Sequence, residues 1–72
     1  MLLQDRGRFD DAELLMREAL ATSRCILGGL HFDTLVSVHN LADLLAKQGR
    51  LDEAEALYRE ALAGRQARAA AA

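Results

Sequence analysis

The chain has 72 residues and a formal net charge of −2, with aromatic residues at only 4% and no proline. A chain this short forms one small domain at most, and alanine and leucine supply most of its apolar content, which is the composition of helices. Its acidic balance lacks the basic cluster that attracts nucleic acid or an anionic membrane surface, so neither partner is expected.

The apolar runs are too short to suggest a membrane span, which needs about 20 apolar residues. The N-terminus lacks the apolar stretch and flanking basic residues of a signal peptide. Cys25 is the single cysteine, so it forms no internal disulfide, which fits a reducing compartment. We therefore expect a soluble protein of the cytoplasm.

The first predicted elements are a short helical segment from Met1 to about Arg6 and a second helix from about Phe9 to Leu27. Gly7 stands between them, where a left-handed conformation ends one helix and lets the next begin. The second helix carries an apolar stripe at three- and four-residue steps, consisting of Ala12, Leu15, Met16, Ala19 and Leu20. Glu13 lies four residues before Arg17, the spacing of a surface ion pair.

A connector with Gly28 and Gly29 stops that helix, and Asp33 or Thr34 caps the next one through a side-chain oxygen. This next helix is expected from about Thr34 to Gln48. One of its sides is apolar and consists of Leu35, Val38, Leu41, Ala42 and Leu45. Another side carries Val36, His39, Asn40, Asp43 and Lys47.

The last predicted helix begins at about Leu51, after Gly49, and again pairs an acid with a base four residues later, Glu55 with Arg59. Its apolar stripe consists of Ala54, Leu57, Tyr58, Ala61 and Leu62. The terminal AGRQARAAAA can extend this helix because alanine is the strongest helix former, but it carries no stripe to bury.

The chain repeats itself with a period of 42 residues. Residues 2–21 and 44–63 are identical at 13 of 20 positions, and most mismatches keep size or polarity. Each helical hairpin has more apolar surface than it covers alone, so stacked copies shield one another. About three such units are normally needed for stability, and this chain holds about one and a half. Neighbouring repeats of a longer chain, or other chains, are expected to complete the core.

The stretch LVSVHNLADLLAKQGRLDEAEALYREAL resembles the tetratricopeptide repeat, in particular the 42-residue variety of kinesin light chains. The small and aromatic positions of that pattern fall on Ala42, Ala54, Tyr58 and Ala61, and its turn glycine on Gly49. Its LG-x-x-HPDTL connector is matched at Leu27, Gly28, His31, Asp33, Thr34 and Leu35, whereas Phe32 replaces the usual proline. Asn40, Leu41 and Ala42 match its NLA.

The resemblance implies an all-α fold of antiparallel helix-turn-helix repeats in a superhelix, with about one and a half repeats present. It divides the chain into residues 1–27 (the end of a first-repeat helix A plus helix B), 28–33 (connector), 34–64 (second repeat, helices A and B) and 65–72 (Ala-rich tail).

The resemblance also implies a non-catalytic module of an adaptor or scaffold, whose first helices line a concave groove for a peptide of a partner protein. The groove candidates are Val36, His39, Asn40, Asp43 and Lys47. Asn40 is expected to bond the peptide backbone, because an amide both donates and accepts; its alternative role is a bond to the adjacent repeat. His39 either responds to the charge of the ligand near pH 6.5 or is simply a polar residue of the groove wall. Asp43 and Lys47 either contact the ligand or form an ion pair with each other.

Catalysis, cofactors and metal binding are not expected. Zinc would need convergent ligands with a recognisable spacing such as C-x-x-C, which Cys25, His31 and His39 do not provide. Cys25 is interpreted instead as a small buried apolar group. The alternative to the peptide-binding hypothesis is a structural repeat unit that associates with copies of itself to complete its core.

Overall fold

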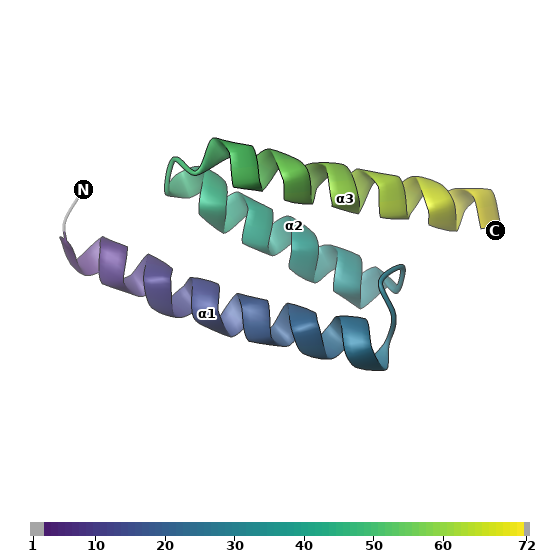
Figure 1. Ribbon diagram of the computed structural model, residues 1–72, viewed down its shortest axis with the longest axis horizontal. Coiled ribbons are helices and arrows are strands. Elements are labelled where there is room, and N and C mark those ends of the chain that lie inside the picture. Colours follow the sequence, from purple (N-terminus) through teal and green to yellow (C-terminus); the bar gives the residue numbers. More distant parts are fainter. Residues whose placement is uncertain (1–2, 72) are drawn as a thin grey trace.

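The chain folds into three helices joined by two short turns. The computed structural model describes residues 3–71, with side chains from residue 8 onward. The helices are α1 (Leu3–Ile26), α2 (Phe32–Lys47) and α3 (Leu51–Ala71), and the described residues contain no strand. Figure 1 shows α2 lying between α1 and α3, with each helix antiparallel to the one before it. The all-α prediction is confirmed.

The predicted helix break at Gly7 is wrong. α1 runs without interruption from Leu3 to Ile26, so no separate helix ends at Arg6; Met1 and Leu2, where that segment was to begin, lie outside the described residues. An interior glycine costs a helix only about 1 kcal/mol relative to alanine, which the strong helix formers around Gly7 offset. The division of the chain into repeats, connector and tail stays a prediction.

The equivalent Gly49 does form the predicted turn. Its φ is +81°, a left-handed value that glycine adopts without strain. The amide of Gly49 bonds to the carbonyl of Ala46 at 3.0 Å, and that of Arg50 to the carbonyl of Leu45 at 2.9 Å, so the last carbonyls of α2 are satisfied. Gly28, with φ +93°, closes the end of α1 in the same way through a bond to the carbonyl of Ser23.

The start of α2 also differs from the prediction, which had placed the cap at Asp33 or Thr34. The helix begins at Phe32, and His31 is its N-cap: the backbone N–H of Asp33 donates to Nδ1 of the His31 ring at 3.1 Å. Asp33 lies in the first turn, where the helix dipole favours its charge. Thr34 is fully buried, and within the described part of the chain its hydroxyl has no hydrogen-bond partner.

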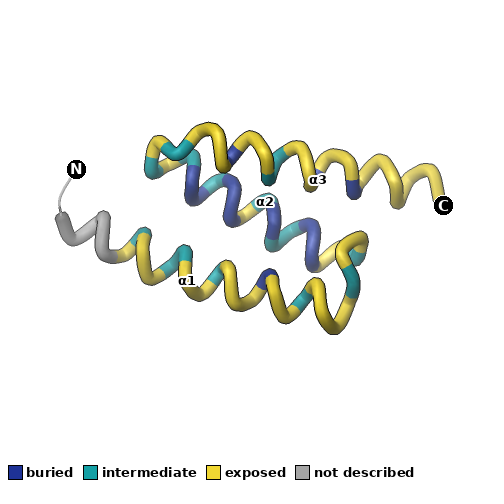
Figure 2. Tube along the Cα trace, viewed as in Figure 1, coloured by how far each residue is buried: buried dark blue, intermediate teal, exposed yellow. Residues whose placement is uncertain are grey.

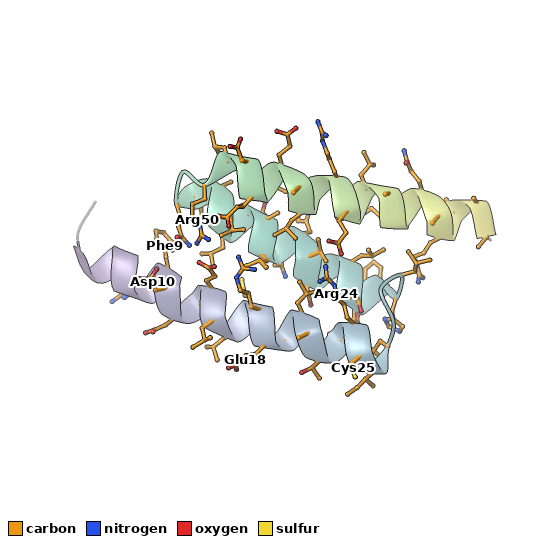
Figure 3. All side chains as sticks on the ribbon, viewed as in Figure 1. Phe9, Asp10, Glu18, Arg24, Cys25 and Arg50 are labelled. Carbon is orange, nitrogen blue, oxygen red and sulfur yellow. The ribbon has the colours of Figure 1, made fainter. Side chains whose placement is uncertain are left out.

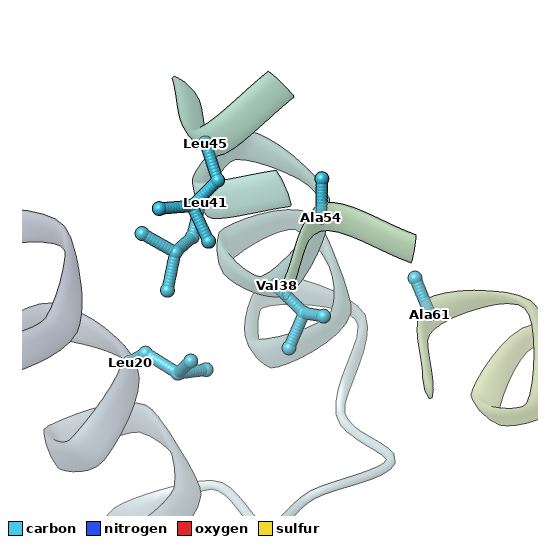
Figure 4. Packing of buried hydrophobic residues seen from close by; sticks show 6 residues of the cluster. All are labelled: Leu20, Val38, Leu41, Leu45, Ala54 and Ala61. Atoms are coloured by element: carbon cyan, nitrogen blue, oxygen red, sulfur yellow. The ribbon is translucent and has the colours of Figure 1, made fainter. Parts of the chain in front are cut away.

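The core surrounds α2. All five residues of its predicted apolar side are buried, and Figure 2 shows most of the burial on this helix. Val38, Leu41 and Leu45 form a cluster with Leu20 of α1 and with small side chains of α3 (Figure 4). Alanines at the α3 positions let the two backbones approach closely, as helix packing requires. α2 therefore holds the other two helices together.

The stripes predicted for the outer helices are buried only in part. On α1, Leu20 is buried but Leu15 is 65% exposed, and on α3, Ala54 and Ala61 are buried but Leu62 is exposed. Cys25, interpreted from the sequence as buried, is also exposed. Each outer helix has α2 on one side, so residues that point elsewhere stay in solvent.

The terminal AGRQARAAAA does extend the last helix through Ala71, as predicted, but it is not free of buried contacts. Gly64 is buried, and a Cβ placed on it would lie 2.4 Å from a methyl group of Leu35 in α2. One turn further, the Arg68 guanidinium donates to the backbone carbonyl of Leu30 at 2.9 Å. The absence of a side chain at Gly64 lets the end of α3 lie against the start of α2.

An ion-pair network links α1 to the α2–α3 turn. Arg50 contacts Glu13 at 2.5 Å and Glu53 at 2.5 Å, and Arg17 contacts Glu13 at 2.8 Å. Figure 3 shows Arg50 reaching from the turn toward α1. Hydrogen bonds from Arg17, and next from Arg50, hold the pKa of Glu13 below its ordinary value of 4.5, although partial burial opposes the shift. The predicted pairs Glu13–Arg17 and Glu55–Arg59 are both present.

We expect Gly64→Ala to destabilise the chain although alanine is the better helix former. The gain in helix propensity is about 1 kcal/mol, whereas forcing a methyl group against Leu35 costs about 1–3 kcal/mol. Urea unfolding followed by circular dichroism should show a net loss of about 1 kcal/mol. In a Leu35→Val background, which makes room, the same substitution should become neutral or stabilising; equal losses in both backgrounds would contradict the close approach.

Glu13→Gln should lower the free energy of unfolding at pH 7 by about 1 kcal/mol, since it removes the charge that Arg17 and Arg50 share. The folded chain binds a proton at Glu13 more weakly than the unfolded chain does. Its contribution is therefore complete above pH 4.5 and is lost as the pH falls through the lower folded pKa.

The urea midpoints of the chain and of Glu13→Gln should accordingly converge as the pH falls through the lowered folded pKa of Glu13. Glu18→Gln is the matched control, because Glu18 is exposed on the side of α1 turned away from α2 (Figure 3). A difference between the chain and Glu13→Gln that stayed constant with pH would show that the Glu13 charge is not involved.

Candidate functional site

The candidate site is the side of α2 that lies away from the buried cluster and meets α3 only at its edge. Asn40 and Lys47 are exposed there, and Val36, His39 and Asp43 are half-buried. These residues recur at three- and four-residue steps, so they lie along one side of a single helix. We call this surface the open side of α2. The buried residues of α2 occupy its other sides, which face α1 and α3.

At the edge of the open side, the Asp43 carboxylate lies next to the side chains of Tyr58 and His39. The Tyr58 hydroxyl of α3 donates to Oδ1 of Asp43, and Nε2 of His39 lies 3.4 Å from Oδ2. The His39 and Tyr58 rings meet edge to face, with centroids 5.4 Å apart. The pKa of Tyr58 is raised above 10.0 because its hydroxyl donates to Asp43, and burial and the carboxylate charge add to the shift.

Sequence analysis left open whether Asp43 and Lys47 pair with each other or contact a ligand, and the contacts of Asp43 bear on this question. Asp43 has Tyr58 and His39 as its partners, and among the described contacts Lys47 forms no ion pair. Asp43 is therefore not neutralised by Lys47, and Lys47 extends from the helix as a cation with three donors. Two polar groups of the open side are exposed: the amide of Asn40, which can donate and accept hydrogen bonds, and the ammonium group of Lys47, which can only donate.

The role of Tyr58 was not foreseen from the sequence. Tyr58 was assigned to the apolar stripe, which accounts for its ring but not for its hydroxyl. A signal was present, because Tyr58 replaces Met16 in a block that is otherwise strongly repeated, and a buried tyrosine hydroxyl usually has a partner. Arg50 was likewise not predicted to reach Glu13, since 37 residues separate them.

The exposed groups of the open side can form hydrogen bonds with a peptide. Within residues 8–71, no three side chains of His, Cys, Asp or Glu gather where they could hold a metal ion. No described helix combines the length and the apolarity that crossing a bilayer requires. The amide of Asn40 can donate to and accept from a peptide group at once, and Lys47 can donate to a carbonyl or carboxylate.

The pKa of Tyr58 offers a direct test of its bond to Asp43. Tyr58 is the only tyrosine, so ultraviolet absorbance during an alkaline titration reports it alone. We expect a midpoint above 10.0 in the folded chain and a lower one in Asp43→Asn, which removes the charge but keeps an acceptor. Because the folded pKa is raised, the associated stability is lost as the pH rises through it. Identical midpoints in both proteins would contradict the bond.

Comparison with known proteins gives a match to a protein family. The family model described as Tetratricopeptide repeat matches residues 1–67, nearly the whole chain. No curated protein and no solved structure matches. The matched span includes all of α2, its turn and most of α3, and their helix-turn-helix arrangement is the one that such repeats adopt. The chain belongs to the tetratricopeptide repeat family.

Proposed function

We propose that this chain is a non-catalytic interaction module whose open side of α2 contacts a peptide segment of a partner protein. The observation that carries the proposal is the exposure of Asn40 and Lys47 on the side of α2 that lies away from the buried cluster. Repeats of this family generally mediate contacts between proteins, which supports the proposal. α2 is held on both flanks, so its exposed side chains are presented from a rigid element.

The chemistry of the open side favours a ligand read mainly through its backbone. Asn40 satisfies a peptide group without selecting a side chain, and Lys47 adds attraction for a carbonyl or carboxylate oxygen. Asp43 is already engaged by Tyr58 and His39, so a basic ligand would have to compete for it. His39 then lines the site as a wall held against Tyr58.

The 42-residue period and the connector residues support a kinesin light chain-like variety of the repeat, and an adaptor or scaffold role in the cytoplasm. Both remain proposals. No cofactor, metal, nucleic acid or membrane is part of the proposed function.

A peptide selected against the chain from a random display library provides the test. Asn40→Ala should weaken its binding about tenfold, the loss expected when a buried peptide group loses its partner, and Lys47→Ala should weaken it less. Glu18→Ala, on the outer side of α1, is the control and should bind as the parent chain does. Calorimetry measures all of these. A peptide that binds equally well to Asn40→Ala and Lys47→Ala would place the site elsewhere.

A second candidate function, self-association, is favoured by the large apolar side chains left in solvent. Leu14 and Leu15 on α1, and Leu51 and Leu62 on α3, are all more than half exposed. Sedimentation equilibrium with circular dichroism over a hundredfold concentration range distinguishes the two. A discrete oligomer whose helicity rises with concentration supports self-association, whereas a monomer throughout supports the peptide-binding role.

A further inference from the structure

The Asp43 carboxylate fixes the position of the proton on the His39 ring. Its Oδ1 accepts the hydrogen bond of the Tyr58 hydroxyl, and its Oδ2 lies 3.4 Å from Nε2 of His39. A carboxylate only accepts hydrogen bonds, so the neutral imidazole is stabilised with its proton on Nε2, the nitrogen that faces Asp43. Nδ1 then has no proton and is a hydrogen-bond acceptor.

Nδ1 is the nitrogen of His39 that a ligand can reach. The His39 side chain is 41% exposed. In the described part of the chain, the polar side-chain atoms that are buried without a partner belong to Thr34 and Gln48. Nδ1 has no hydrogen-bond partner there either, so it is open to solvent. It lies on the open side of α2 together with the amide of the next residue, Asn40.

Tyr58 maintains this arrangement from a different helix. Its ring meets the His39 ring edge to face, with centroids 5.4 Å apart, while its hydroxyl bonds to Asp43. A rotation of His39 or of Asp43 would therefore break a contact with α3. Tyr58 orients the carboxylate, and the carboxylate in turn orients the imidazole.

The His39 ring is the group of this cluster whose charge changes near neutral pH. It is faced by Asp43 from its own helix and by Tyr58 from α3, and none of the described contacts joins it to α1. Carboxyl groups ordinarily titrate below about pH 5. The pKa of Tyr58 is raised above 10.0 by its bond to Asp43. An imidazole, in contrast, changes its charge between about pH 5 and 8.

We propose that His39 makes the ligand preference of the open side depend on pH. This inference rests on the proposed function, because the ligand is a peptide bound on that side. With neutral His39, Nδ1 accepts a hydrogen bond, as from a peptide N–H, and the charges of Asp43 and Lys47 cancel. Protonated His39 donates from Nδ1 instead and adds a positive charge beside Asn40. Acidification thus turns the open side toward acidic peptides.

The spacing of the cations suggests a simple acidic probe. His39 and Lys47 are eight residues apart, which is about 12 Å along a helix. An extended peptide covers this distance in about four residues, so its backbone can pass Asn40 on the way. The probe is Ac-Gly-Asp-Gly-Gly-Gly-Asp-Gly-NH2. Its control peptide has asparagine in place of both aspartates.

Each peptide is titrated into the isotope-labelled chain at about pH 8 and about pH 5.5, where aspartate stays ionised, and amide chemical shifts are recorded. We expect the acidic probe to bind about fivefold more tightly at the lower pH, the effect of one added charge at a solvated site, and the control peptide to change little. His39→Gln should abolish the difference. His31→Asn is the matched control, because it removes the other histidine, keeps an N-cap acceptor and should leave the difference intact.

The orienting role of Tyr58 is tested without a ligand. Ring nitrogen chemical shifts distinguish the two neutral forms of an imidazole, and at about pH 8 we expect His39 to carry its proton mainly on Nε2. Tyr58→Phe keeps the contact between the rings but removes the hydroxyl that orients Asp43. It should lower the proportion of this form and weaken the pH effect on binding, while circular dichroism shows that the chain stays helical. An unchanged proportion would contradict the role of the hydroxyl.

The proposal is overturned if the acidic probe binds equally at both pH values, or fails to bind at the lower one. A difference that persists in His39→Gln would assign the effect to another group. The proposed function fails differently, when a library-selected peptide binds Asn40→Ala and Lys47→Ala as well as it binds the parent chain. If the selected peptide depends on Asn40 but the acidic probe shows no pH effect, the open side binds peptides and only the role of His39 is wrong.

Discussion

The structure depends on the burial of α2 between its two neighbours. Val38, Leu41 and Leu45 are completely removed from solvent, and this takes side chains from both α1 and α3. Fully burying each such residue is worth about 1.5–3 kcal/mol, so this row is the main favourable contribution available to so short a chain. The outer helices bury far less, because each has a single neighbour (Figure 2). Loss of either outer helix would expose α2.

Electrostatics adds a specific contact to this apolar packing. Glu13 and Arg50 are distant in sequence but adjacent in space, and they fix the N-terminal half of α1 against the turn at the far end of α2. The carboxylate is oriented by Arg17 before Arg50 reaches it, so little side-chain freedom is lost when the second bond forms. The 42-residue period places the same oriented carboxylate, Glu55 with Arg59, on the outer side of α3.

The packing of α2 also decides which of its residues are available for binding. Once two sides of the helix are covered, the residues that remain accessible are those of the open side, with Asn40 and Lys47 most exposed. Asp43 stays partly exposed there, but its carboxylate already accepts a hydrogen bond from the Tyr58 hydroxyl and has Nε2 of His39 nearby. Packing of the core thus decides which residues of α2 are accessible, and the Tyr58 hydroxyl decides which of their groups is already bonded.

Periodicity and the internal repeat were sufficient to predict three long helices, the turn at Gly49, the apolar side of α2 and the ion pairs within single helices. These features depend on residues three to seven positions apart, which the chain itself brings together. The five candidate residues of α2 share one side for the same reason, although their role in binding stays a prediction.

Tertiary structure decided the rest. Gly7 and Gly49 stand in nearly the same local sequence, yet the helix continues through the first and ends at the second. The difference is that α3 folds back on α2 and buries Ala54 and Ala61, which offsets the cost of the turn. Likewise, only the packed structure brings Tyr58 to Asp43, Arg50 to Glu13 and Gly64 to Leu35. Local sequence determines where helices can form, whereas which faces are buried, and so which residues remain free to bind, depends on contacts between distant segments.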